Sequence, residues 1–277
     1  MTIVARSFVR ITAEKRTGPT ILEQMSRSPL LMAILSPLAI LAVWEILARA
    51  QVLDTRFFPT PSSVIVDLFA LLRAGQIFVD AGWTIGRVLV GFVLGAIPGV
   101  VMGVLLGLSP FVRALLQPAI SALYPVPKIA LFPLIMMIFG IGEASKWVIV
   151  AVAVFFQVFY STLAGVVNID RIYLDVASNF KASRWQLCRT IALPGALPFI
   201  FTGCQLGLGM ALVIVVIAEN FGTQVGLGYL IWQSWQVFEV KDMFVYLLLV
   251  SLLGYGLQVA ILRLQSAVIP WKKVEAD

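Results

Sequence analysis

Six long runs of apolar residues alternate with shorter polar stretches along this chain. The runs cover residues 30–48, 86–107, 117–139, 147–167, 197–218 and 243–262. A helix needs about 20 apolar residues to cross roughly 30 Å of hydrocarbon, and each run is close to that length. The pattern therefore predicts an all-α integral membrane protein with six transmembrane helices.

The second run carries a glycine at every fourth position, and its five glycines share one face of a helix. They are Gly91, Gly95, Gly99, Gly103 and Gly107. Small residues at this spacing leave a smooth stripe that a second backbone can approach closely. We expect the stripe to pack against another helix of the same bundle.

The third run is interrupted by prolines. The segment from Tyr124 to Lys128 holds Pro125 and Pro127, which break the backbone hydrogen-bond ladder twice in succession. Carbonyls freed in lipid must be satisfied by protein or by water in a cavity. A broken helix that carries Lys128 at membrane depth is thus a candidate element of a transport path. A kink near the interface with a snorkelling lysine is the alternative.

Composition agrees with a membrane protein and excludes several other classes. The 277 residues are 60% apolar and 12% charged, whereas soluble domains are about half apolar and about a quarter charged. Histidine is absent and the only cysteines are Cys188 and Cys204, so we expect no metal, haem or other cofactor on this chain. The basic residues behind the net charge of +6 are too dispersed to indicate nucleic acid.

The lysines and arginines predict the orientation, because cytoplasmic loops are enriched in them. Both termini are expected in the cytoplasm, with residues 1–29 as a basic N-terminal segment, 30–262 as the membrane domain and 263–277 as a C-terminal tail. The first run lacks a cleavage site and is too long for a signal peptide. A short amphipathic stretch at 64–72 is expected on the outer surface. The basic residues on the predicted inner side are Arg6, Arg10, Lys15, Arg16, Arg27, Arg113, Arg171, Lys181, Arg184, Arg189, Arg263, Lys272 and Lys273.

The loop between the fourth and fifth runs, about residues 169–194, predicts a short amphipathic helix at the cytoplasmic surface. Val176, Phe180, Leu187 and Ile191 recur at helical spacing among polar residues. Such a helix serves either as a membrane-surface float or as a docking element for a soluble partner. Pro194 is expected to end the helix and redirect the chain into the fifth span.

This loop resembles the E-A-A-x3-G-x9-I-x-L-P signature of permease subunits in ATP-binding-cassette (ABC) importers. Asp175-Val176-Ala177 stands at E-A-A, and Ile191-Ala192-Leu193-Pro194 matches I-x-L-P at the correct spacing. Lys181 occupies the position of the signature glycine, which is a departure from the pattern.

Further segments resemble the subfamily that imports sulfonates, taurine, nitrate and related small solutes. The resemblance covers roughly residues 30–262 and implies the type I (MetI-like) importer permease fold. The similar segments are Trp44-Glu45, Phe58-Pro59-Thr60-Pro61-Ser62, Arg87 to Phe92, Pro125 to Leu134, Phe139 to Glu143, Ala218-Glu219 and Gly226-Leu227-Gly228.

The resemblance implies a bacterial inner-membrane complex. Its expected partners are a second copy of the permease, two ABC ATPase subunits that carry ATP and Mg²⁺, and a periplasmic or lipid-anchored solute-binding protein. The chain contains no G-x-x-x-x-G-K-[ST] phosphate loop, so it is expected to be a transport subunit and not an enzyme. The residues implied in coupling to the ATPase are Asp175, Val176, Ala177, Phe180, Lys181, Ala182, Ile191, Leu193 and Pro194.

Several polar or adaptable residues inside the spans are candidates for the solute path, since ionisable groups at membrane depth are costly. Lys128 could attract an anionic solute such as a sulfonate, taurine, nitrate or bicarbonate. Glu219 could pair with Lys128, line a gate or only shape a loop. Gln205 lies among glycines and either reaches the path or bonds to a neighbouring helix. Met210 and Tyr124 complete the set.

The residues leave a second class of function open. Intramembrane charge and a broken helix also fit an ion-gradient-driven secondary transporter or a channel. An intramembrane enzyme is disfavoured, because the sequence offers neither a metal-ligand set nor a nucleophile–base pair.

Overall fold

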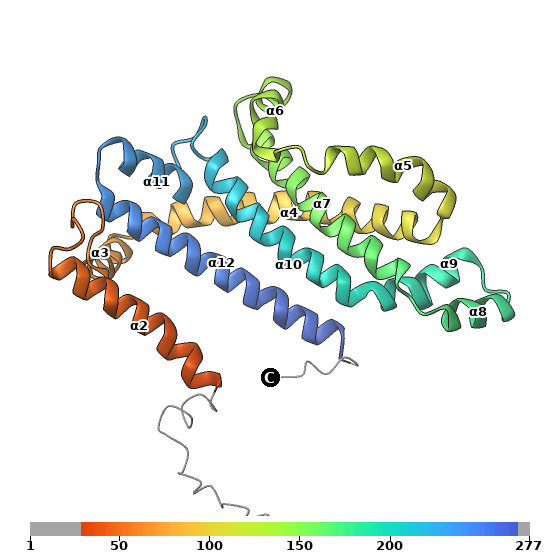
Figure 1. Cartoon of the computed structure of the whole chain (residues 1–277). Coiled ribbons are helices and arrows are strands. Elements are labelled where there is room, and N and C mark those ends of the chain that lie inside the picture. Colours follow the sequence, from red (N-terminus) through yellow and green to blue (C-terminus); the bar gives the residue numbers. More distant parts are fainter. Residues whose placement is uncertain (1–28, 271–277) are drawn as a thin grey trace, which may run out of the picture.

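The computed structural model describes residues 29–270, which form helices joined by short connections, without any strand in that range. Figure 1 shows the long helices running beside one another as a bundle. The basic segment 1–28 and residues 271–277 of the predicted tail lie outside the described residues.

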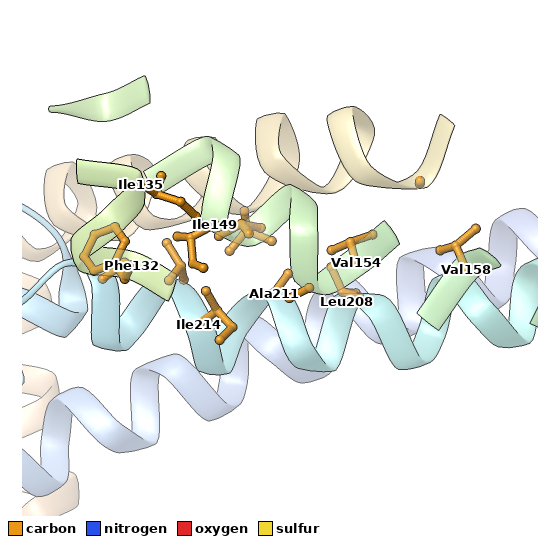
Figure 2. Close-up of a cluster of buried hydrophobic side chains, with 14 residues drawn as sticks. Phe132, Ile135, Ile149, Val154, Val158, Leu208, Ala211 and Ile214 are labelled. Atoms are coloured by element: carbon orange, nitrogen blue, oxygen red, sulfur yellow. The ribbon is translucent and has the colours of Figure 1, made fainter. Parts of the chain in front are cut away.

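Three helices form the centre of the bundle: α4 (Gln76–Leu108), α7 (Glu143–Val167) and α10 (Leu193–Ala218). Their shared core contains Ile149 and Val154 from α7 and Leu208 and Ile214 from α10, all buried (Figure 2). Since all three helices are also long and apolar enough to span a membrane, the bundle's interior and its lipid-facing surface are both apolar.

The glycine stripe of α4 packs against α7, as predicted. A Cβ atom placed on Gly103 would lie 2.6 Å from Cβ of Thr162, and one on Gly107 would lie 2.5 Å from Cβ of Val166. Both distances are shorter than atoms tolerate, so only glycine permits this approach of the two helices.

The third predicted span is broken, also as predicted. It consists of α5 (Pro110–Leu123) and a second part, Lys128–Phe139, that contains α6 (Phe132–Phe139), and the two parts are bent by 87°. Between α5 and α6 lie the two prolines and a 3₁₀ turn, η1 (Lys128–Leu131). Within residues 29–270, five helices are long and apolar enough to cross a membrane, or six if the bent pair counts as one span.

Four other helices lie at the end of the bundle away from residues 171–187 or along its side (Figure 1). They are α2 (Pro29–Arg49), α3 (Pro61–Ala74), α11 (Leu227–Gln236) and α12 (Val240–Val268). α3 begins where Thr60 caps the backbone N–H of Ser63 and a proline takes the first helical position, and it contains the predicted amphipathic stretch. α11 was not expected.

Several predicted boundaries differ from the structure, and the broken span, for example, begins at residue 110 instead of 117. The helix α4 starts at residue 76 instead of 86, and α12 continues six residues past 262 into the expected tail. Hydropathy marks only the apolar part of a helix, whereas each of these helices continues through polar turns.

Candidate functional site

Two short helices between α7 and α10 project from one end of the bundle (Figure 1). They are α8 (Arg171–Asn179) and α9 (Arg184–Leu187), and we call residues 170–187 the elbow. Asp170 caps α8 by accepting a hydrogen bond from the backbone of Ile172 at 3.0 Å. A reciprocal capping box between Ser183 and Gln186 starts α9. Side-chain caps within the elbow therefore fix the residue at which each of the two helices begins.

The turn between α8 and α9 closes in a Schellman geometry, with Lys181 in the left-handed conformation at φ 52°. The backbone N–H of Ala182 donates to the carbonyl of Ala177, and that of Lys181 donates to the carbonyl of Ser178, each over 2.9 Å. Glycine is the usual residue at this position because it has no Cβ to strain. The chain makes the turn with a lysine instead.

The predicted single amphipathic helix is wrong, because this turn separates Val176 and Phe180 from Leu187 and Ile191. Apolar spacing alone does not show a reversal between two helical segments.

The expectation for Pro194 is also wrong. A π-helical turn, η2 (Cys188–Ala192), precedes α10, and the backbone N–H of Leu193 donates to the carbonyl of Cys188. The wider turn accommodates the proline in the first turn of α10, so the helical run is continuous from Arg184 to Ala218. The chain is redirected at Lys181.

The elbow presents apolar side chains to its surroundings. Ile172, Tyr173, Val176 and Phe180 lie on one side of α8 by helical spacing, and all are exposed. Phe180 is 83% exposed and Trp185 on α9 is 70% exposed. Large apolar groups gathered on a projecting element indicate an interaction surface.

The other residues implied in coupling have several different placements. Asp175 is exposed on the polar side of α8, whereas Ala177 is buried beneath the turn that also contains Ala182. Leu193 is exposed at the start of α10. Ile191 and Pro194 line a cavity of about 450 Å³ at the base of the elbow, together with Gly165, Asn168, Ile169, Asp170, Tyr173, Thr190, Gly195 and Phe199.

A cluster of charged side chains lies at the opposite ends of α7 and α10. Arg87 of α4 is 1% exposed and uses every N–H of its guanidinium. Its Nε and Nη2 donate to the two carboxylate oxygens of Glu143, each over 2.7 Å, and its Nη1 donates to Glu219 over 2.7 Å. The other two bonds go to the carbonyl of Val225 and the hydroxyl of Thr223. Arg87 thereby joins α4 to α7, to α10 and to the loop before α11.

Glu219 is completely buried and accepts hydrogen bonds from three groups. Besides Arg87, it accepts hydrogen bonds from the hydroxyl of Thr84 at 2.9 Å and from the backbone N–H of Gly228 at 2.8 Å. The hydroxyl of Thr84 accepts from Leu227 N, and Asp80 accepts from Gly226 N. These bonds compensate the cost of burying the charge and hold the start of α11 against α4.

The structure brings together only two of the five predicted path residues. The ammonium group of Lys128 lies 4.7 Å from the ring centre of Tyr124 and donates to that residue's carbonyl. Glu219 pairs with Arg87 instead of Lys128, which corrects the suggested pairing. Gln205 donates to Gln265 of α12 over 2.8 Å, as the helix-packing alternative predicted. Met210 packs against the central core.

Lys128 also lines an apolar cavity of about 590 Å³. Its ammonium group lies 4.9 Å from the ring centre of Phe156, and among the ion pairs of residues 29–270 none involves Lys128. The cavity lies between α4, α7 and the broken span, and its lining includes Pro98, Val126, Val152 and Phe155.

The sequence interpretation missed Arg87 as a functional candidate, although it quoted the segment that contains it. A signal was present: one arginine stands near the start of an apolar run, and acidic residues stand at the ends of two others, at Glu143 and Glu219. Charges at matching span ends are candidates for a shared buried pair.

Comparison with known proteins agrees with this architecture. Residues 99–273 match the family described as "Binding-protein-dependent transport system inner membrane component". The chain is 34% identical over 235 residues to SsuC of Escherichia coli K12, which is named as an aliphatic sulfonates transport permease protein. That match covers 85% of this chain and 89% of the relative.

Two further relatives carry related names. The taurine transport system permease protein TauC of Escherichia coli K12 is 33% identical, over 84% of this chain and 86% of TauC. The nitrate import permease protein NrtB of Synechocystis is 28% identical, over 83% and 86% of the two chains. The family match and these relatives together show that the chain belongs to the multi-pass membrane permeases of binding-protein-dependent ABC importers.

Proposed function

We propose that this chain forms the translocation path of an ABC importer for a small anion and receives its driving force through the elbow. Two copies pair around the path, both termini are cytoplasmic, and two ATPase subunits with ATP and Mg²⁺ bind the elbows. A solute-binding protein delivers cargo at the opposite face. The names of the relatives support sulfonates, taurine and nitrate as the solute class.

The exposed apolar side of the elbow is the observation that carries the proposal. Tyr173, Val176 and Phe180 occupy an element that projects from the bundle and that is fastened directly to two core helices. A soluble subunit that covers these side chains would remove them from water, and its movement would be passed to α7 and α10. A few buried aromatic anchors typically supply most of the binding energy at such interfaces.

Lys128 supports an anionic solute. Its ammonium group donates to the carbonyl of Tyr124 and lies over the rings of Tyr124 and Phe156. Lys128 also lines an otherwise apolar cavity. We propose that Tyr124 and Lys128 line the path. A sulfonate or nitrate oxygen would there find a cation without having to displace a carboxylate.

The coupling proposal is tested with two matched variants of α8, Val176→Asp and Ser178→Asp. Both residues are exposed and the same charge is introduced, but helical spacing puts them on opposite sides of α8. The tagged chain is co-expressed with the ABC ATPase and the solute-binding protein of its importer, and the ATPase retained after purification is measured. A charge inside the apolar interface is expected to weaken ATPase binding by roughly 2 kcal/mol, about 30-fold, and the Ser178 variant to retain it.

If both variants retain the ATPase equally, the apolar side of the elbow does not lie in the ATPase interface, and the coupling proposal is wrong. Solute accumulation by the purified chain alone in vesicles, driven by an ion gradient without ATP, would favour the secondary-transporter alternative. Neither result is expected.

A further inference from the structure

The two helices that flank the elbow carry carboxylates at their far ends, and both carboxylates bind the same arginine. Glu143 is the first residue of α7, and Glu219 directly follows the last residue of α10. Arg87 donates to both over 2.7 Å. In Figure 1, α7 and α10 run from the elbow at one end of the bundle towards α6 and α11 at the other. The pair is thus joined at both ends: by the elbow at one and by Arg87 at the other.

The contacts between these two ends make α7 and α10 a stiff pair. A Cβ on Gly203 of α10 would lie 2.8 Å from Cβ of Ser161 on α7, and one on Gly207 would lie 3.2 Å from a methyl group of Val154. Helices packed this closely slide as units and do not deform continuously. A displacement applied at the elbow therefore reaches the far ends, provided that those ends stay joined.

The loop after Glu219 is the element placed to receive that displacement. Arg87 also binds Thr223 and the carbonyl of Val225, while Asp80 and Thr84 hold the backbone of Gly226 and Leu227. The loop leads into α11, whose Leu227 and Gly228 are buried. Arg87 supplies two of these four bonds from α4.

We propose that Arg87 is a positioning residue of transport: it locks the far ends of α7 and α10 together, so that movement of the elbow is delivered to the loop before α11 as a single displacement. This inference rests on the proposed function. The two carboxylates that bind Arg87 differ in their exposure to solvent: Glu219 is fully buried, whereas Glu143 is 33% exposed. Glu143 is therefore the carboxylate that can be altered with the least damage to the fold.

The test compares Glu143→Gln with Lys241→Gln in the full complex of permease, ATPase and binding protein, reconstituted in vesicles. Lys241 forms an ion pair of 2.6 Å with Asp67, but that pair joins α12 to α3, and neither of these helices flanks the elbow. The solutes are radiolabelled taurine, ethanesulfonate and nitrate, each supplied separately. The readout is the number of solute molecules imported per ATP hydrolysed.

Loss of the bidentate charge pair at Glu143 is expected to lower this ratio about tenfold while ATP hydrolysis continues, an effect within the range for residues in coupling networks. The Lys241 variant is expected to keep the wild-type ratio. Thermal unfolding of both variants in detergent accompanies the assay, so that a folding defect is seen directly.

The outcomes separate the two proposals. A wild-type complex that imports none of these solutes with ATP would overturn the proposed function, and the inference with it. A wild-type complex that transports, with a Glu143 variant whose uptake and ATP hydrolysis fall in equal proportion or not at all, would overturn only the role of Arg87.

Discussion

Arg87 and Glu219 are separated by 132 positions in the chain, yet Nη1 of the first donates to Oε1 of the second over 2.7 Å in a site closed to water. Removing one partner of a buried pair leaves the other charge uncompensated, which is costly, whereas pairs in water contribute little. This relationship fixes where the ends of α4 and α10 meet.

The first prediction concerns this pair. Glu219→Gln removes the charge with little change in volume, and we expect it to lower the free energy of unfolding by about 3 kcal/mol because Arg87 then lacks one of its two carboxylates. Thermal unfolding in detergent measures the change. Asp54→Asn is the control, since the ion pair of Asp54 with Arg56 has the same 2.7 Å length but is exposed. An equal loss in both variants would contradict the prediction.

The second prediction concerns the seam between α4 and α7. Gly95→Ala places a Cβ against the backbone carbonyl of Ala151 and within 2.9 Å of Cβ of Val154, so α7 must move away. We expect a destabilisation of about 1–3 kcal/mol, typical of overpacking. The same substitution at Gly82, on the same helix, meets no atom within 4 Å and should be neutral or slightly stabilising. Equal unfolding temperatures of the Gly95 and Gly82 variants would contradict the prediction, because they would show that α7 moves away from α4 without a cost in stability.

Six spans, the glycine seam and the broken third helix could be predicted from the sequence, because each depends on local composition: run length, Gly91 to Gly107 at a constant spacing, and Pro125 with Pro127. Arg87 could not be placed by the same reasoning. Its partners come from three distant segments, and a charge near the start of an apolar run resembles an interfacial residue until those segments are brought together.

The elbow shows that sequence patterns can also mislead about residues that are close together in the chain. Apolar spacing from Val176 to Ile191 fits one helix, and only the backbone shows that Lys181 reverses the chain. Pro194 was expected to end a helix, but whether a proline does so depends on the turn before it, and here that turn is π-helical.

A third prediction follows from the conformation of Lys181. A residue other than glycine in the left-handed region carries roughly 1–2 kcal/mol of strain, so Lys181→Gly should stabilise the elbow and preserve ATPase binding. Lys181→Val should do the reverse, because a β-branched side chain tolerates this region least. Hydrogen exchange of the amides of residues 177–183 measures both effects. Slower exchange in the valine variant than in the glycine variant would be inconsistent with the Schellman turn.

The fourth prediction tests the solute path. Lys128→Met keeps a long apolar stem over Tyr124 and Phe156 but removes the cation, whereas Lys128→Arg keeps the charge. If an anion passes this site, uptake of ethanesulfonate or nitrate at low concentration should fall about tenfold or more in the first variant, as expected for the loss of a hydrogen bond to a charged group. The arginine variant should retain most uptake. Unchanged transport by the methionine variant would exclude Lys128 from the path.

The length of the uninterrupted helical run from Arg184 to Ala218 has one more consequence. At about 1.5 Å per residue, its 35 residues extend to about 50 Å. A bilayer with its headgroups is only about 40–45 Å thick. The rod is longer than that thickness, so under the proposed function its end at Arg184 is expected to stand in water as ordered helix, where an ATPase subunit would bind it without entering the lipid.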